Sequence, residues 1–223
     1  MTFRTDLAVE CMEAVGEKTP GVTSEESRFG KVTVSRIRIH SKEGAEALGR
    51  PQGRYITVGV PPFSDEIAGE DVITVLRREL RGLIDADGPV LVLGLGNTAI
   101  TPDSLGPKVA RRVLATRHIT GEVARRTGLE DLRRVAVLAP GVLGQTGVET
   151  GEILGGVVDR IQPSAVLVVD ALASRRLNRL GCTVQMSDTG IAPGSGIGNR
   201  RMKINEETVG VPVISVGVPT VVD

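Results

Sequence analysis

The stretch "PVLVLGLGNTAITPDSLGPK" (residues 89–108) joins a short apolar strand to a glycine-rich turn and a delayed helix. The apolar run from Val90 to Leu93 has the length of a buried strand. Residues 94–99 fit the loose G-x-G-x-x-A pattern of a dinucleotide-binding loop. Thr101-Pro102-Asp103 then postpones the helix that should come next. The stretch therefore suits either a loop that cradles a phosphate or a loop that presents a carboxylate.

Apolar strands alternate with amphipathic helices on both sides of this stretch. Buried strands are predicted at 134–140, 165–170, 182–187 and 211–217, and helices at 66–84, 106–119, 146–161 and 171–180. This alternation predicts an α/β fold whose doubly wound, mostly parallel sheet is flanked by helices.

The N-terminal part of the chain has a different pattern. Residues 31–40 alternate apolar and charged side chains, which is typical of a half-solvated strand, and residues 54–60 form a second strand that Pro61 and Pro62 end. These strands predict an added antiparallel edge or flap within residues 31–65. Because no long linker or repeat interrupts the chain, we expect a single domain over residues 1–223.

The composition excludes several classes of partner. The chain has 27 basic and 27 acidic residues, so it lacks the charge excess of a protein that binds nucleic acid by bulk electrostatics. Cys11 and Cys182 have no metal-ligand spacing, and we predict neither a metal nor a cofactor. The start has no signal-peptide pattern, and no run approaches the roughly 18 apolar residues of a membrane helix. We therefore expect a soluble, intracellular protein with no direct nucleic-acid or membrane partner.

The residues after the loop exclude the nucleotide-binding interpretation of residues 94–99. A nicotinamide site needs an acidic residue roughly 20 positions further on, and residues 114–120 contain none. The G-x-x-x-x-G-K-[ST] pattern of P-loop enzymes is also missing from the sequence. The loop instead presents Asp103.

Three aspartates come after predicted strands, where functional groups of α/β sheets gather. They are Asp103, Asp170 and Asp188. Asp103 and Asp170 also suit the N-caps of the helices predicted after them. Asp188-Thr189-Gly190 matches the D-[ST]-G triplet of pepsin-like proteases, but Asp and Gly also favour turns. Asp188 is therefore either a catalytic or a structural residue.

Six segments together resemble the germination protease (spore protease) family of endospore-forming bacteria. They are "RTDLAVE" (4–10), "GLGNTAITPDSLGP" (94–107), "APGVLGQTGVET" (139–150), "VVDALASR" (168–175), "SDTGIAPGSGIGN" (187–199) and "GVPVISVGVPTVVD" (210–223). They occur in the family order over nearly the whole chain. A more distant similarity of "VLGLGN" and "VVDA" to hydrogenase maturation endopeptidases implies a core like that of those enzymes.

The resemblance implies an endopeptidase that starts the degradation of small acid-soluble spore proteins during germination. It also implies a cytoplasmic location in the spore core, a homotetramer and a zymogen that processes itself, here between Asp6 and Leu7. The family is considered an atypical aspartic protease, and its proposed catalytic carboxylates correspond to Asp103 and Asp170. The family's chains continue beyond the segment that ends here at Asp223, so its C-terminal extension is expected to be absent.

Two neighbouring carboxyl groups suit peptide hydrolysis because they cannot both ionise cheaply. The ionised group takes a proton from water, and the neutral group donates one to the carbonyl oxygen or the leaving amine. This chemistry requires no metal or cofactor.

Further residues are candidates for binding the substrate. Backbone N–H groups around Gly194 and Gly196 could stabilise an oxyanion, although the same glycines suit a simple connector. Asn97, next to Gly96, and Asn199 could orient a substrate carbonyl, and Asn97 also suits a turn. Arg175 and nearby arginines could select acidic residues, or they could form a solvated helix face.

Two other functions are compatible with the sequence. The first is a metal-dependent maturation endopeptidase of the same core fold, which a chelator would inhibit. The second is a non-catalytic module that binds an acidic protein through its arginines.

Overall fold

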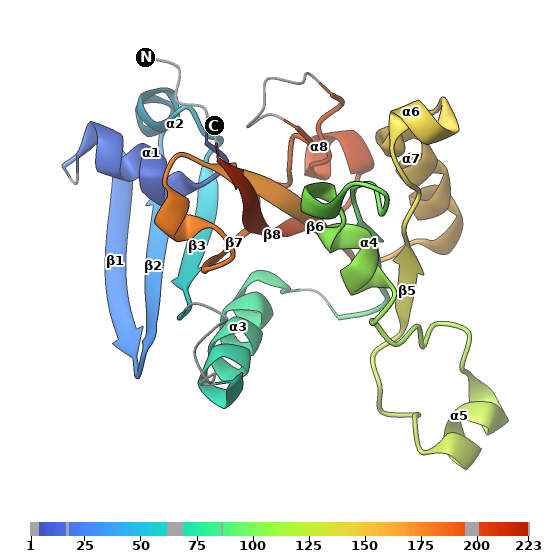
Figure 1. Ribbon diagram of the computed structural model, residues 1–223. Coiled ribbons are helices and arrows are strands. Elements are labelled where there is room, and N and C mark those ends of the chain that lie inside the picture. Colours follow the sequence, from blue (N-terminus) through green and yellow to red (C-terminus); the bar gives the residue numbers. More distant parts are fainter. Residues whose placement is uncertain (1–4, 17, 62–68, 86, 195–200, 223) are drawn as a thin grey trace.

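The computed structural model describes residues 5–16, 18–61, 69–85, 87–194 and 201–222 (Figure 1). The strands are β1 (Val22–Phe29), β2 (Val32–Ile39), β3 (Gly53–Gly59), β4 (Val90–Gly94), β5 (Val135–Leu138), β6 (Ala165–Ser174), β7 (Thr183–Ser187) and β8 (Val213–Val222). The α-helices are α1 (Ala8–Val15), α2 (Lys42–Leu48), α3 (Gly69–Leu83), α4 (Leu105–Ala110), α5 (Gly121–Thr127), α6 (Leu143–Thr146), α7 (Thr150–Ile161) and α8 (Glu206–Val209). Two short 3₁₀ helices are η1 (Thr101–Asp103) and η2 (Leu177–Arg179).

All eight strands belong to one mixed sheet with the order β1-β2-β3-β7-β8-β6-β4-β5. The half from β8 to β5 is parallel, because β8, β6, β4 and β5 all run in the same direction. The half from β1 to β8 is antiparallel throughout. The α/β class and the antiparallel N-terminal element are thus confirmed, whereas a mostly parallel sheet is wrong. The reason is local: a tight turn at Gly30 and Lys31 joins β1 directly to β2, and such turns join antiparallel strands.

Helices cover both faces of the sheet. On one face, α3 packs Val75 and Leu83 against the apolar side chains of β2, β3 and β7. On the other face, Leu154 and Val158 of α7 pack against β4 and β6. Helices α1 and α2 cover the antiparallel half on this second face, with Cys11 and Leu48 in a separate apolar cluster. Helix α5 projects away from the sheet (Figure 1).

Three sequence predictions differ from the structure. The helix predicted at 106–119 ends at Ala110, after which the N–H groups of Thr116 and Arg117 bond to the carbonyl of Val135 on the edge strand. The helix predicted at 171–180 is wrong, because β6 continues to Ser174 along β8 and only η2 comes after it. Strand β1 has no counterpart among the predicted strands.

No helix in the described ranges is long and apolar enough to cross a membrane.

Candidate active site

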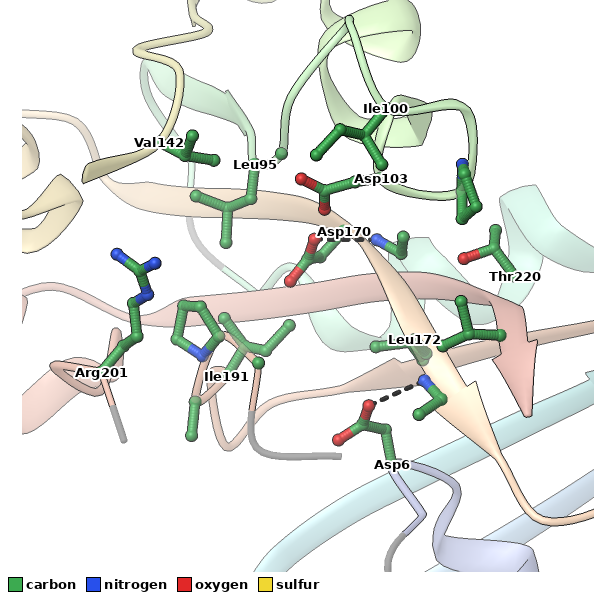
Figure 2. Close-up of a pocket in the computed structure, with 18 of the residues that line it drawn as sticks. Asp6, Leu95, Ile100, Asp103, Val142, Asp170, Leu172, Ile191, Arg201 and Thr220 are labelled. Atoms are coloured by element: carbon green, nitrogen blue, oxygen red, sulfur yellow. Dashed lines mark hydrogen bonds between the residues drawn. The ribbon is translucent and has the colours of Figure 1, made fainter. Parts of the chain in front are cut away.

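A pocket of about 430 Å³ opens where β4 ends and β6 continues (Figure 2). Its walls come from the loop after β4, β6, the end of β8, the segment before α6, the segment 191–194 and the N-terminal segment. Asp6, Asp103 and Asp170 all line it, together with apolar side chains such as Leu95 and Leu172. The pocket therefore places carboxyl groups from distant parts of the sequence among apolar neighbours.

Asp103 is positioned by the tight loop after β4. Gly96 has a φ of +118°, and a Cβ there would overlap the carbonyl oxygen of Asp103, so the close approach requires glycine. The N–H of Asn97 donates to both the carboxylate (2.8 Å) and the carbonyl (3.0 Å) of Asp103. Burial raises the pKa of the Asp103 carboxyl above its ordinary value, although the Asn97 N–H and the charge of Arg201 act in the opposite direction.

The N-cap alternative for Asp103 is wrong. Helix α4 begins after Ser104, which occupies the N-cap position, and the Asp103 side chain turns back to Asn97. Asp103 is therefore held at the pocket by its own loop.

Asp170 lies within β6, directly after the last residue that pairs with β4. The residue is 6% exposed, and one carboxylate oxygen accepts a hydrogen bond from the N–H of Ala171 (2.8 Å). The pKa of Asp170 is raised to about 7, mainly by burial and also by the nearby charges of Asp103 and Asp6, while the hydrogen bond from Ala171 N–H acts in the opposite direction. The helix-cap alternative is wrong here too, because β6 continues past Asp170 as a strand. A carboxyl group in this environment is mostly protonated below about pH 7.

The two aspartates approach each other across the pocket. Figure 2 shows the carboxyl groups of Asp103 and Asp170 pointing toward one another, one from the loop after β4 and the other from β6. No hydrogen bond joins the two carboxyl groups directly in the part of the chain that the structure describes. Such a pair can hold one proton below the pKa of Asp170, which is the protonation state that acid–base activation of water requires.

The glycine-rich segment is described only in part. Gly194 lines the pocket, and Arg201 enters it from beyond that segment (Figure 2). Gly196 and Asn199 lie outside the described residues.

Of the other candidate binding residues, only Gly96 lines the pocket. The Asn97 side chain accepts from Ala99 N–H and Gln145 Nε2 just behind it. Arg175 comes directly after β6, where its backbone N–H donates to Glu10 (2.8 Å), and it does not line the pocket.

Asp188 lies apart from the other two aspartates. It comes directly after β7, whose last residue, Ser187, pairs with Ser215 of β8, and it does not line the pocket. Its carboxylate accepts from Arg54 N–H (2.7 Å) and pairs with the Arg54 guanidinium (2.6 Å). This arrangement matches the structural alternative, since Asp188 fastens the turn after β7 to β3.

Asp6 also lines the pocket, although no local sequence pattern indicates this position. Asp6 reaches it because the N-terminal segment lies against the end of β6, where Asp6 N–H donates to the carbonyl of Ala173 (2.8 Å). Leu7 is completely buried next to it. Two polar side chains hold this segment, those of Glu10 and Gln185. They could not be predicted either, because nothing in their local sequence distinguishes them from surface residues.

In the described ranges, no three His, Cys, Asp or Glu side chains gather in an arrangement that could hold a metal ion.

The chain is similar to known proteins over nearly its whole length. The sequence profile of the germination protease family matches residues 5–223. The chain belongs to the germination protease family. A germination protease of Caldanaerobacter subterraneus subsp. tengcongensis is 48% identical over 99% of this chain and 69% of its own length. Those of Clostridium tetani and Priestia megaterium are 45% and 42% identical over all of this chain, which covers 71% and 64% of them. The family membership supports a peptidase.

Proposed function

We propose that this protein is an endopeptidase that activates water with the Asp103–Asp170 pair and begins the degradation of small acid-soluble spore proteins during germination. The family membership and the names of the relatives support a protease that acts in germination, and the substrate class is proposed from the family resemblance. The observation that carries the mechanism is the meeting of two carboxyl groups in one pocket, with the pKa of Asp170 raised to about 7.

The proposed roles depend on the two environments. Asp170 is the more deeply buried group and holds the proton, while Asp103 receives an N–H hydrogen bond that favours its ionised form. Asp103 takes a proton from the attacking water, and Asp170 donates its proton to the carbonyl oxygen or the leaving amine. Arg201, at the same pocket, favours the charge on Asp103.

The decisive experiment replaces each carboxyl group by its isosteric amide. Asp103→Asn and Asp170→Asn should each lower kcat for cleavage of a small acid-soluble spore protein by at least about 100-fold, as expected for loss of a general acid or base. Asp188→Asn is the matched control, because it removes an ion pair outside the pocket and should retain activity. Near wild-type cleavage by either of the first two variants would refute the assignment.

A metal-dependent mechanism in the same pocket is tested separately. Incubation with a strong chelator should leave the rate of cleavage unchanged, and a rate that falls and then returns with added zinc would favour the metal-dependent alternative.

Self-processing is proposed at the bond between Asp6 and Leu7. This bond begins at a residue that lines the pocket, and Gln185 Nε2 donates to its carbonyl oxygen (2.6 Å). N-terminal sequencing of protein incubated at high concentration should start at Leu7 in the wild type and not in Asp103→Asn. An intact terminus in the wild type would contradict the proposal. The homotetramer and the location in the spore core are proposed from the family resemblance, and sedimentation analysis and immunolocalisation would test them.

A further inference from the structure

Strand β6 extends beyond its neighbour β4 and leaves one edge open. The last pair joins Gly94 to Val169, and Leu95 N–H donates to the Val169 carbonyl (2.9 Å). From Asp170 to Ser174, β6 still pairs with β8 on its other side. In the ranges that the structure describes, no strand pairs with the open edge of this part of β6. Residues 170–173 along it line the pocket.

The main-chain N–H and C=O groups of β6 point alternately to its two sides, as in any strand. In a parallel strand, the N–H and the C=O of one residue point to the same side, and those of the next residue point to the other side. On the side of β6 that faces away from β8, the Val169 carbonyl bonds to Leu95, and both main-chain groups of Ala173 bond to Asp6. Ala171 lies between these two residues, so its main-chain groups point to the same side. The N–H of Ala171 turns to Asp170, which leaves its carbonyl facing the pocket.

A segment of this chain already lies on one end of the edge. Asp6 N–H donates to the Ala173 carbonyl (2.8 Å), and Ala173 N–H donates to the Asp6 carboxylate (2.8 Å; Figure 2). The next residue, Leu7, has the extended angles φ −88° and ψ 120°. The chain bends at Asp6 and is extended at Leu7, so this segment shows that a main chain outside the sheet can hydrogen-bond to this edge.

Two buried side chains fix that segment. The Gln185 carboxamide donates to the Asp6 carbonyl (2.6 Å) and accepts from Ala8 N–H (2.6 Å), so it satisfies the main chain on both sides of Leu7. Glu10 accepts from the N–H groups of Arg175 (2.8 Å) and Arg176 (3.2 Å), and so ties α1 to the end of β6. The bound segment is therefore held by main-chain and amide contacts in addition to its apolar side chain.

We propose that the open edge of β6, residues Asp170–Ser174, binds the substrate main chain as an added strand and so delivers an extended peptide to the carboxyl pair. The inference rests on the proposed endopeptidase function and specifies its substrate class: a polypeptide segment that is extended at the cleavage site, with a short acidic side chain opposite Ala173. Strand addition supplies affinity through the main chain, and specificity comes from alternate side chains.

The test is a scan of N-methylated peptides. The probe is a peptide with the sequence of residues 2–10 of this chain, methylated at one backbone nitrogen at a time. Because Asp6 of the chain itself bonds to Ala173, affinity is measured on a full-length variant that carries both Asp103→Asn and Asp6→Ala, which removes the Asp6 carboxylate from the Ala173 N–H. The value of kcat/KM is measured on the wild type. Each bond to the edge that is lost should weaken binding by roughly fivefold or more, since one hydrogen bond contributes about 1 kcal/mol. Methylation at the intervening positions should change it less than about twofold, which gives an alternation with a period of two residues.

The outcomes separate this inference from the proposed function. Equal effects at all positions, or no binding of the unmodified peptide, would overturn strand addition. Cleavage without alternation would overturn strand addition and leave the endopeptidase intact. Alternating affinity without cleavage by the wild type would support strand addition and refute the endopeptidase.

A protein variant probes the same edge. Ala173→Pro removes the N–H that faces the open side and spares the pairing with β8, and prolines are tolerated at strand edges. In a protein that also carries Asp6→Ala, so that the Asp6 carboxylate no longer takes this N–H, we expect Ala173→Pro to raise KM for the peptide about fivefold, as for one lost hydrogen bond, with an unchanged far-UV circular dichroism spectrum. An unchanged KM in a folded variant would contradict the inference. If the variant does not fold, the peptide scan decides the question.

Discussion

The buried Asp170 carboxyl should make the protein less stable as the pH rises. The pKa of this group is 3.8 for an ordinary aspartate and about 7 in the folded protein. Between these two values the unfolded chain has released the proton while the folded chain keeps it. Stability therefore falls with increasing pH across this window, and the full stability from this group is present only below about pH 4.

The size of the effect depends on the shift in pKa. One pKa unit corresponds to about 1.4 kcal/mol, so a shift of about 3 units lowers the free energy of unfolding by about 4 kcal/mol above pH 7. That is a large part of the roughly 5–15 kcal/mol by which proteins of this kind are stable. Asp170→Asn removes the ionisation and keeps an oxygen that can accept from Ala171 N–H. The variant should therefore be inactive but more stable than the wild type at pH 8.

The assay is urea unfolding at pH 4.5, 6 and 8, monitored by far-UV circular dichroism because the chain has no tryptophan and one tyrosine. The difference in unfolding free energy between Asp170→Asn and the wild type should grow by about 3 kcal/mol in favour of the variant from pH 4.5 to pH 8. A difference that does not depend on pH would show that Asp170 titrates normally, and the argument for a shared proton would fail. Asp188→Asn is again the control and should show no such increase.

Two other predictions concern the pH dependence of cleavage and the loop after β4. The wild-type kcat/KM should decrease as the pH rises through about 7, because Asp170 then loses the proton that it donates; a rate that stays constant to pH 9 would contradict this role. Gly96→Ala should lower kcat by at least about 100-fold and the unfolding free energy by about 1–3 kcal/mol, because the new Cβ overlaps the Asp103 carbonyl at a positive φ. The control Gly155→Ala, in open space on α7, should retain activity and gain about 0.5–1 kcal/mol in the same urea titration.

The buried strands could be predicted from sequence because a short, continuous run of apolar residues is typical of a strand that is buried on both faces. Residues 90–93 and 165–170 are examples, and both proved to be central strands. β1 could not be predicted, since its sequence "VTSEESRF" is mostly polar and lies exposed at the edge of the sheet. The segment "ALAS" after Asp170 has local helix propensity, but pairing with β8 keeps it a strand. Tertiary contacts decided its structure.

The candidate site was predictable in part for similar reasons. The delayed helix after Gly96 indicated that the loop presents Asp103, and the end of an apolar run indicated Asp170. Their meeting in one pocket depends on β4 and β6 being neighbours, which no local pattern contains. Asp6, Glu10 and Gln185 act through contacts with residues more than 150 positions away, so only the folded chain shows them.

The position of β8 has a consequence for folding during synthesis. Val213–Val222 is the last strand along the sequence, yet it lies between β7 and β6 in the middle of the sheet. The strands made before it form two groups, β1-β2-β3-β7 and β6-β4-β5, that share no pairing until β8 joins them. Because the N-terminal part of a chain emerges first from the ribosome, the nascent protein carries two additional open sheet edges, on β7 and β6, until these residues appear. Such edges invite pairing with other chains, so chaperone protection matters most just before translation of this sheet is complete.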